Sequence, residues 1–226
     1  MTEPVRLAKR IAELRGCSRR EAELLIAGGW VHVDGVMVEE PHFRVAGQAL
    51  TIDPAADLDQ TQDVTLLLHQ PARTLAPAPP GIAGHWADDP GARRILKRHF
   101  VQLTPCAPLD AATSGLVVWT QDWRIVRKLT ADAATLEHEI HVDVAGELPV
   151  DGLKRMTRAL PRIKLSWQSE HRLRVAMKGT HPGQIARLCE TAGLQVLAMK
   201  RIRLGGVAMG KLPAGQWRYL REGERF

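Results

Sequence analysis

The most chemically suggestive stretch of this sequence is residues 109–122, Leu-Asp-Ala-Ala-Thr-Ser-Gly-Leu-Val-Val-Trp-Thr-Gln-Asp. It places one carboxylate, Asp110, in a short polar turn before an apolar segment, Leu116–Thr120, that predicts a buried strand. A turn before a rigid strand can keep a catalytic side chain both exposed and fixed in position. Asp110 is therefore the candidate catalytic residue, although an isolated aspartate in such a turn can equally serve as a cap.

The segments after this turn alternate between strand-like and helix-like patterns. Strands outnumber helices without a strict strand–helix–strand order, so we expect an α+β fold with a mainly antiparallel mixed sheet. The expected strands are Leu116–Thr120, Glu139–Val144, Ile163–Trp167, Leu173–Met177, Val196–Leu204 and Gln216–Leu220, and the expected helices are Trp123–Leu129, Leu153–Leu160 and Pro182–Ala192. These elements belong to a larger domain, residues 61–226, in which the proline- and glycine-rich residues 71–92 predict an irregular loop.

A smaller domain, residues 1–60, precedes it. Val5–Arg15 has apolar residues at the spacing of an amphipathic helix, and the capping box Ser18–Glu21 begins a second helix that ends at the glycines 28–29. The pair Asp34-Gly35 between two short alternating segments is a strong signal for a two-residue hairpin turn. Two helices and a hairpin within about 40 residues predict a compact module.

Charge and cysteine content restrict the class of protein. The net charge of +6 is unevenly distributed: residues 1–20 and 93–226 are basic, and residues 21–69 are acidic. Basic surfaces favour a polyanionic partner, because neutralised phosphates release counterions. Three cysteines without CxxC spacing predict neither a disulfide framework nor a zinc site. With no signal pattern and no apolar run near the roughly 20 residues of a membrane span, we expect a cytoplasmic monomer without a membrane partner or a metal.

The N-terminal module resembles an S4 RNA-binding domain. The residues that carry the resemblance are Arg6-Leu7, Lys9, Cys17-Ser-Arg-Arg-Glu-Ala22, Leu25-Ile26, Gly29 and Val31-His-Val-Asp-Gly35. In that family the face formed by the helices and hairpin contacts the phosphates of structured RNA, which offers shape and backbone rather than readable base edges. The resemblance implies RNA contacts by Arg6, Lys9, Arg19 and Arg20.

The larger domain resembles the bacterial ribosomal-RNA branch of the pseudouridine synthases. Its catalytic motif, Leu-Asp-x-x-Thr-x-Gly-Leu with a closing Thr-x-Asp, matches residues 109–122. The other matching segments, in order, are His69-Gln70-Pro71, Gly179–Glu190 (with Gln184-Ile185 and Arg187), Leu197–Arg203 and Leu212–Leu220 (with Pro213, Gly215 and Trp217-Arg218). Together with the S4-like module, the resemblance covers nearly the whole chain.

This resemblance implies isomerisation of uridine within structured RNA, with ribosomal RNA as the expected substrate and with no metal or organic cofactor. The glycosidic C1′–N1 bond breaks and is remade to C5 of the same base, which must be flipped out of the helix. Asp110 would act as covalent nucleophile or as stabiliser of developing charge, and both alternatives stay open. The resemblance further implies Arg201 as the electrostatic partner of Asp110, and Thr113, Arg187 and Arg203 as substrate or RNA contacts.

The sequence departs from the family pattern around Asp110. Pro108 replaces an arginine of the catalytic motif, Gln70 replaces a lysine, and Ala186 replaces an arginine. The strand position of the family tyrosine is occupied by isoleucine or histidine, so Ile140 and His141 are the possible tyrosine substitutes. Two hypotheses follow: an active pseudouridine synthase, or an RNA-binding protein that has kept the fold without the chemistry.

Overall fold

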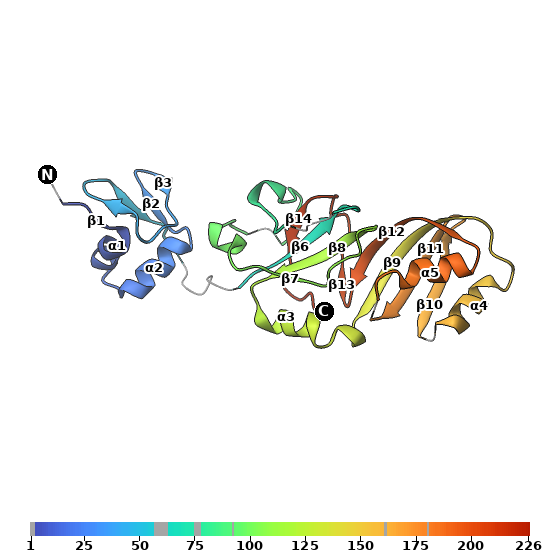
Figure 1. Cartoon of the computed structure of the whole chain (residues 1–226). Coiled ribbons are helices and arrows are strands. Elements are labelled where there is room, and N and C mark those ends of the chain that lie inside the picture. The colour runs from blue at the N-terminus through green and yellow to red at the C-terminus, as the bar shows by residue number, and fades with distance from the viewer. Residues whose placement is uncertain (1–2, 57–62, 75–77, 92, 161, 180) are drawn as a thin grey trace. The chain divides into compact units, whose positions relative to one another are not determined.

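The computed structural model describes residues 3–56, 63–74, 78–91, 93–160, 162–179 and 181–226 (Figure 1). Its internal contacts divide the chain into two compact units, Met1–Asp63 with Arg94–Val101, and Val64–Arg93 with Gln102–Phe226. The domain boundary expected between residues 60 and 61 lies outside the described residues. The first unit also differs from the expected division, which assigns Arg94–Val101 to the second domain.

The described part of the first unit contains two α-helices, two small sheets and the 3-10 helix η3 (Lys97–Phe100). One sheet has the strand order β3-β2-β5, and the other pairs β1 with β4. Their apolar side chains share one core with the inner faces of the helices, including Leu7, Ile11, Leu25 and Ile26. The elements are β1 (Val5–Arg6), α1 (Leu7–Arg15), α2 (Arg19–Ala27), β2 (Val31–Val33), β3 (Val36–Met37), β4 (Arg44–Val45) and β5 (Leu50–Ile52).

The local signals of this module are confirmed. Ser18 Oγ accepts a hydrogen bond from the Glu21 amide at 3.2 Å, and the Glu21 carboxylate accepts one from the Ser18 amide at 2.7 Å. The hairpin between β2 and β3 turns at Asp34 (φ 49°) and Gly35 (φ 79°). Two successive positive φ angles match the right-handed twist of the paired strands.

The segment Arg94–Val101 is held against the first unit by long-range polar contacts. The Arg94 guanidinium donates to the Gly29 carbonyl, pairs with Asp53 at 3.0 Å, and lies 4.3 Å from the centre of the Trp30 ring. These partners are more than 40 residues away along the chain. No local pattern could have indicated them.

In the described part of the second unit, nine strands form one sheet. Seven follow the order β10-β11-β9-β12-β8-β6-β14, with β13 paired to β12 and β7 paired to β8. The β12–β8 pair is parallel and the other pairs are antiparallel, which confirms the expected mixed sheet. The strands are β6 (Thr65–Gln70), β7 (Thr104–Cys106), β8 (Thr113–Thr120), β9 (Glu137–Ala145), β10 (Ile163–Ser169), β11 (Arg172–Lys178), β12 (Gln195–Leu204), β13 (Val207–Ala208) and β14 (Trp217–Tyr219).

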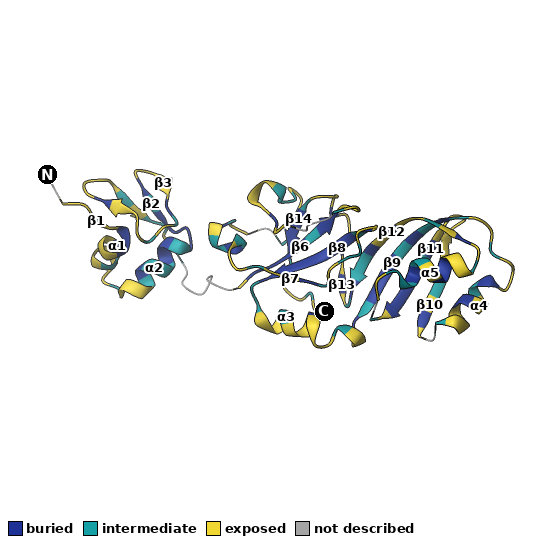
Figure 2. Cartoon of the chain, in the orientation of Figure 1, coloured by how far each residue is buried: buried dark blue, intermediate teal, exposed yellow. Residues whose placement is uncertain are grey.

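Helices cover the sheet with their apolar faces, and their outer faces stay exposed (Figure 2). α4 (Gly152–Ala159) and α5 (Gln184–Thr191) contribute Met156, Ile185 and Leu188 to a core that includes Ile140 and Val142 of β9. α3 (Trp123–Thr130) packs Leu129 into a separate core beside β7 and β8. In the described part of the chain, no helix is long and apolar enough to cross a membrane.

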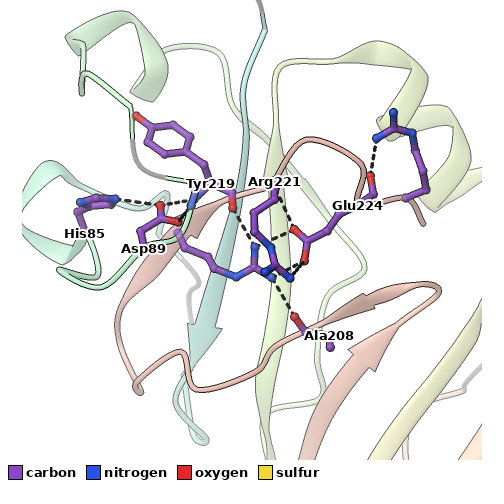
Figure 3. Close-up of polar contacts among 9 residues, drawn as sticks. His85, Asp89, Ala208, Tyr219, Arg221 and Glu224 are labelled. Carbon is purple, nitrogen blue, oxygen red and sulfur yellow. Dashed lines mark hydrogen bonds and ion pairs between the residues drawn. The ribbon is translucent and has the colours of Figure 1, made fainter.

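The proline- and glycine-rich loop is irregular apart from a short turn of 3-10 helix, η2 (Ile82–Gly84), and its residues 75–77 and 92 lie outside the described part. Its anchor is Asp89, whose side chain is fully buried. The Asp89 carboxylate accepts hydrogen bonds from the amides of Tyr219 (2.9 Å) and Gly91 (2.7 Å) and lies 3.0 Å from Nε2 of His85 (Figure 3). The loop is thereby attached to β14.

A second buried ion cluster secures the end of the chain (Figure 3). The Glu224 carboxylate receives a bidentate pair of hydrogen bonds from Arg218, at 2.8 and 2.9 Å, and a further one from the Arg221 guanidinium. Arg218 also donates to the Ala208 carbonyl, so the cluster links β14 to β13. Burial raises the pKa of Glu224, but the hydrogen bonds from Arg218 and Arg221 outweigh it and lower the pKa to about 2.

We expect Glu224→Gln to lower the free energy of unfolding at pH 7 by roughly 3 kcal/mol, since a drop in pKa from 4.5 to about 2 corresponds to that stabilisation. A carboxyl with a lowered folded-state pKa stabilises above its unfolded pKa, and the contribution is lost as the pH falls from 4.5 to about 2. Urea unfolding at pH 7 and pH 2.5 should therefore show a large difference at pH 7 and a small one at pH 2.5. The exposed Glu222→Gln is the matched control, and equal stability of the two variants at pH 7 would contradict the prediction.

Candidate active site and nucleic-acid interface

The second unit contains a cavity of about 740 Å³ at the sheet position where β8 and β12 run parallel. Gly115 of β8, Arg201 of β12 and Ile140 of β9 lie opposite one another in adjacent strands. A Cβ atom at Gly115 would lie 2.6 Å from the Arg201 backbone nitrogen, and the φ angle of Gly115 is +117°. Only glycine fits this approach, which explains the glycine in the motif that follows Asp110.

Asp110 lies in the turn just before β8 and lines this cavity. Its Oδ2 accepts a hydrogen bond of 3.1 Å from the Gly183 amide, at the N-terminus of α5. Its carbonyl accepts from the Thr113 amide at 2.9 Å, which closes the turn. The start of a helix carries a partial positive charge, and the Asp110 carboxylate lies directly against it.

Arg201 is buried in the cavity wall, with 2% of its surface exposed. Its Nε donates to the Leu116 carbonyl at 2.8 Å, and its Nη2 donates to the carbonyls of Leu116 and Ala107. Burial lowers the pKa of Arg201 to about 9. Ala107 has a φ of 51°, a conformation that alanine rarely adopts, and its carbonyl is held by this guanidinium.

No ion pair joins Arg201 to Asp110 in this structure: among the described residues, the guanidinium binds only backbone carbonyls. The physical reason is that the Leu116 carbonyl of β8 and the Ala107 carbonyl of the preceding turn both lie within hydrogen-bond reach of the guanidinium. Arg201 and Asp110 still line the same cavity.

The two possible tyrosine substitutes lie on opposite faces of β9. Ile140 is buried and lines the cavity. His141 does not line it, because neighbouring strand residues point to opposite faces of a sheet. The same alternation brings His138, two residues before Ile140, into the cavity wall. Sequence reasoning missed His138, although a period of two counted back from Ile140 would have indicated it.

His138 is 6% exposed, and its Nδ1 is a buried atom without a hydrogen-bond partner among the described residues. Burial lowers the pKa of His138 to about 4, and the charge of Arg201 acts in the same direction. The imidazole is therefore neutral near pH 7.

The other three residues of the second unit that were expected to contact substrate or RNA lie in different surroundings. Thr113 is buried and lines the cavity. Arg187 lines a neighbouring hollow of about 370 Å³, which shares His181, Pro182 and Gln184 with the cavity. Arg203 lines neither: it forms ion pairs with Glu137 at 2.8 Å and Glu139 at 2.6 Å. Arg174 and Arg203 lower the pKa of Glu139 to about 2, so this network holds its charges at neutral pH.

In the first unit, three expected RNA contacts meet at one hollow of about 420 Å³, lined by Arg6, Lys9 and Arg19. Arg44 also lines it, because the antiparallel pairing of β1 with β4 sets Arg44 opposite Arg6. Sequence reasoning missed Arg44, which follows an acidic stretch. Arg20 is exposed but does not line the hollow. Across the described residues, no group of three His, Cys, Asp or Glu side chains is arranged to hold a metal ion.

Comparison with known proteins identifies two levels of similarity. Residues 5–49 match the S4 domain family. The dual-specificity RNA pseudouridine synthase RluF of Escherichia coli is 26% identical over 97% of this chain and 77% of its own length. The ribosomal large subunit pseudouridine synthase B of Bacillus subtilis is 27% identical over 95% of this chain and 91% of its own. A crystal structure of a pseudouridylate synthase matches the fold with a TM-score of 0.54 and 18% identity, covering 96% of both chains.

The environment of His138 predicts an unusual titration. We expect its imidazole to take up a proton near pH 4 instead of 6.5, as observed by NMR of the histidine rings, with the resonance assigned by its absence in His138→Phe. Because the unfolded chain binds this proton more tightly than the folded one, stability is unaffected by it above pH 6.5, and roughly 3 kcal/mol of stability is lost as the pH falls from 6.5 to about 4. Wild type should therefore lose more stability over this range than His138→Phe. A midpoint above pH 6 would contradict the prediction.

Proposed function

Because residues 5–49 match the S4 domain family and nearly the whole chain is similar to bacterial RNA pseudouridine synthases, we propose that it isomerises uridine to pseudouridine in structured RNA. The substrate is ribosomal RNA, the enzyme acts as a cytoplasmic monomer, and Asp110 is the catalytic residue. The observation that carries this proposal is the position of Asp110: the carboxylate lines a nucleotide-sized cavity and is held by an amide of α5.

In the proposed reaction the target uridine leaves the RNA helix and its base enters the cavity, at a cost of a few kcal/mol for unstacking. The C1′–N1 bond breaks, the base turns within the cavity, and a C1′–C5 bond forms. The C5 proton leaves and N1 gains a proton, so the reaction is a net isomerisation. Asp110 either bonds to C1′ or stabilises the positive charge that develops on the sugar, and both roles require an ionised carboxylate.

The replacements around Asp110 are compatible with this chemistry. Pro108 and Ile140 stand where the family motif has arginine and tyrosine, and both line the cavity. The Gly183 amide and the through-space charge of Arg201 supply positive potential in place of the missing arginine. Ile140 offers an apolar surface to one face of the base. The alternative, an RNA-binding protein without turnover, differs from the proposal in whether the wild type converts any uridine.

The first unit supplies RNA affinity in this proposal. Arg6, Lys9, Arg19 and Arg44 surround one hollow, and Arg6, Lys9 and Arg44 form no ion pair with a described carboxylate. Unpaired cations around a concave surface suit phosphate groups of folded RNA. Arg187, beside the cavity, is proposed as a further RNA contact in the second unit. Arg203 and Arg20 have weaker support, since one is engaged in ion pairs and the other lies outside the hollow.

We expect Asp110→Asn to abolish uridine conversion, a fall of about a thousandfold or more, because the amide can neither attack C1′ nor carry negative charge. Unmodified transcripts of the small- and large-subunit ribosomal RNAs of the source organism are the substrates, and pseudouridine is mapped by mass spectrometry. Asp88→Asn, in the exposed loop, is the matched control. Conversion that persists in Asp110→Asn would refute the assignment of Asp110, and a wild type that binds these RNAs without converting any uridine would favour the alternative.

Replacement of Lys9 or Arg44 by alanine should weaken binding to the same transcripts. It should also reduce the slope of log K against log salt by about one for each phosphate that is no longer neutralised. Fluorescence anisotropy between 50 and 300 mM KCl measures the slope. Arg10→Ala is the control, because Arg10 lies on α1 outside the hollow and pairs with Glu13. A slope that changes equally in Arg10→Ala and Lys9→Ala would show that the hollow is not the binding surface.

A further inference from the structure

His138 is a buried polar side chain of the cavity wall that the mechanism above does not use. It lies on β9 between Met177 of β11 and Leu204 of β12, and it faces the same side of the sheet as Ile140. Apolar side chains surround this part of the cavity, among them Leu136, Ile140 and Met199. A histidine at a largely apolar buried position carries a desolvation cost that the rest of the wall avoids.

The protein itself does not satisfy this imidazole. Among the described residues, the enclosed Nδ1 has no hydrogen-bond partner, and Nε2 forms no hydrogen bond either. Nε2 is not among the enclosed unpartnered atoms, so it is the ring nitrogen that reaches the cavity. The other buried histidines differ: His69 bonds the Leu212 carbonyl at 2.8 Å, and His99 accepts from the Leu96 amide. Nε2 of His138 is thus a polar atom of the cavity wall without a partner among the described residues, and a ligand in the cavity would supply one.

The electrostatics define what kind of ligand group suits this nitrogen. Burial and the positive charge of Arg201 keep the imidazole neutral at physiological pH. A neutral imidazole has one donor and one acceptor nitrogen, and it offers no charge to a phosphate. It suits a neutral polar partner in an apolar setting, such as the carbonyl or N3–H group of a pyrimidine ring.

We propose that His138 is a substrate-binding residue whose Nε2 forms a hydrogen bond with the polar edge of the flipped uracil in the Asp110 cavity. This inference rests on the proposed function and deepens it. It assigns recognition of the base edge to a histidine at the wall position next to Ile140, while Ile140 packs against the ring. In the free protein Nε2 lacks this partner, and the desolvation of the buried imidazole then lowers the stability of the fold.

A substrate-binding role and a structural role of His138 predict different effects of its replacement on the melting temperature. Replacing a histidine that the fold needs would lower the melting temperature. Replacing an unpartnered buried histidine by phenylalanine, which has a similar shape and no polar atoms, should leave the melting temperature equal or raise it. Loss of function together with unchanged or increased stability therefore marks a residue kept for the ligand.

The test compares wild type, His138→Phe, His138→Asn and His141→Phe on the ribosomal RNA transcripts described above. We expect His138→Phe to lower kcat/KM about tenfold or more, with RNA affinity at 150 mM salt unchanged within about twofold, because phosphate contacts dominate affinity. His138→Asn, which keeps a donor and an acceptor, should recover part of the rate. His171→Phe, in an exposed turn, is the control for a histidine-to-phenylalanine change.

Wild-type kcat/KM in His138→Phe would overturn the proposal, and so would a rate loss in His141→Phe instead. A lowered melting temperature of His138→Phe without rescue by His138→Asn would identify a structural role and also overturn it. If wild type converts no uridine, the proposed function fails, and NMR with uridine 5′-monophosphate then decides on His138 alone. A saturable shift of the His138 ring resonance supports the contact, and an unmoved resonance overturns it.

Discussion

The close parallel pairing of β8 with β12 is the constraint on which the rest of the second unit depends. Gly115 allows the backbone of β8 to approach that of Arg201, and the Arg201 guanidinium then crosses to the carbonyls of Leu116 and Ala107. One buried cation thereby fixes the strand pair and the turn that carries Asp110. A side chain at position 115 would separate the strands, and the carbonyls would be left without their donor.

Arg201 illustrates how one residue can serve structure and electrostatics together. Its hydrogen bonds are all to backbone carbonyls, so its net positive charge is not cancelled by a carboxylate among the described residues. This charge lowers the pKa of the neighbouring His138, in the same direction as the burial of the imidazole.

On the opposite face of the same sheet, the charged side chains are paired with one another. Glu139 is bracketed by Arg174 and Arg203, and Asp143 pairs with Arg172, so each carboxylate meets a guanidinium on a neighbouring strand. Paired ions of this kind hold β9 in register between β11 and β12. Because register decides which residues of β9 face inward, this outer ladder helps to keep His138 and Ile140, rather than Glu139 and His141, in the cavity wall.

The sequence by itself determined those features whose signals are local. The capping box at Ser18, the Asp34-Gly35 turn, the helix that ends before Gly193 and the strand after Asp110 each depend on neighbouring residues, and each forms as expected. The motif order also indicated the similarity to pseudouridine synthases, because the matching segments follow one another along the chain. Such features are readable because backbone preferences and periodicity act over a few residues.

Tertiary structure alone decided the contacts between distant segments. Gly183 meets Asp110 across 73 residues, Arg201 meets the carbonyls of the turn instead of the carboxylate, and Arg94 returns to the first unit. Arg44 joins the hollow through a strand pair, and His138 joins the cavity through the register of β9. These outcomes depend on which strands pair and on which acceptors lie within reach of a buried charge. Neither can be predicted from the spacing of residues along the chain.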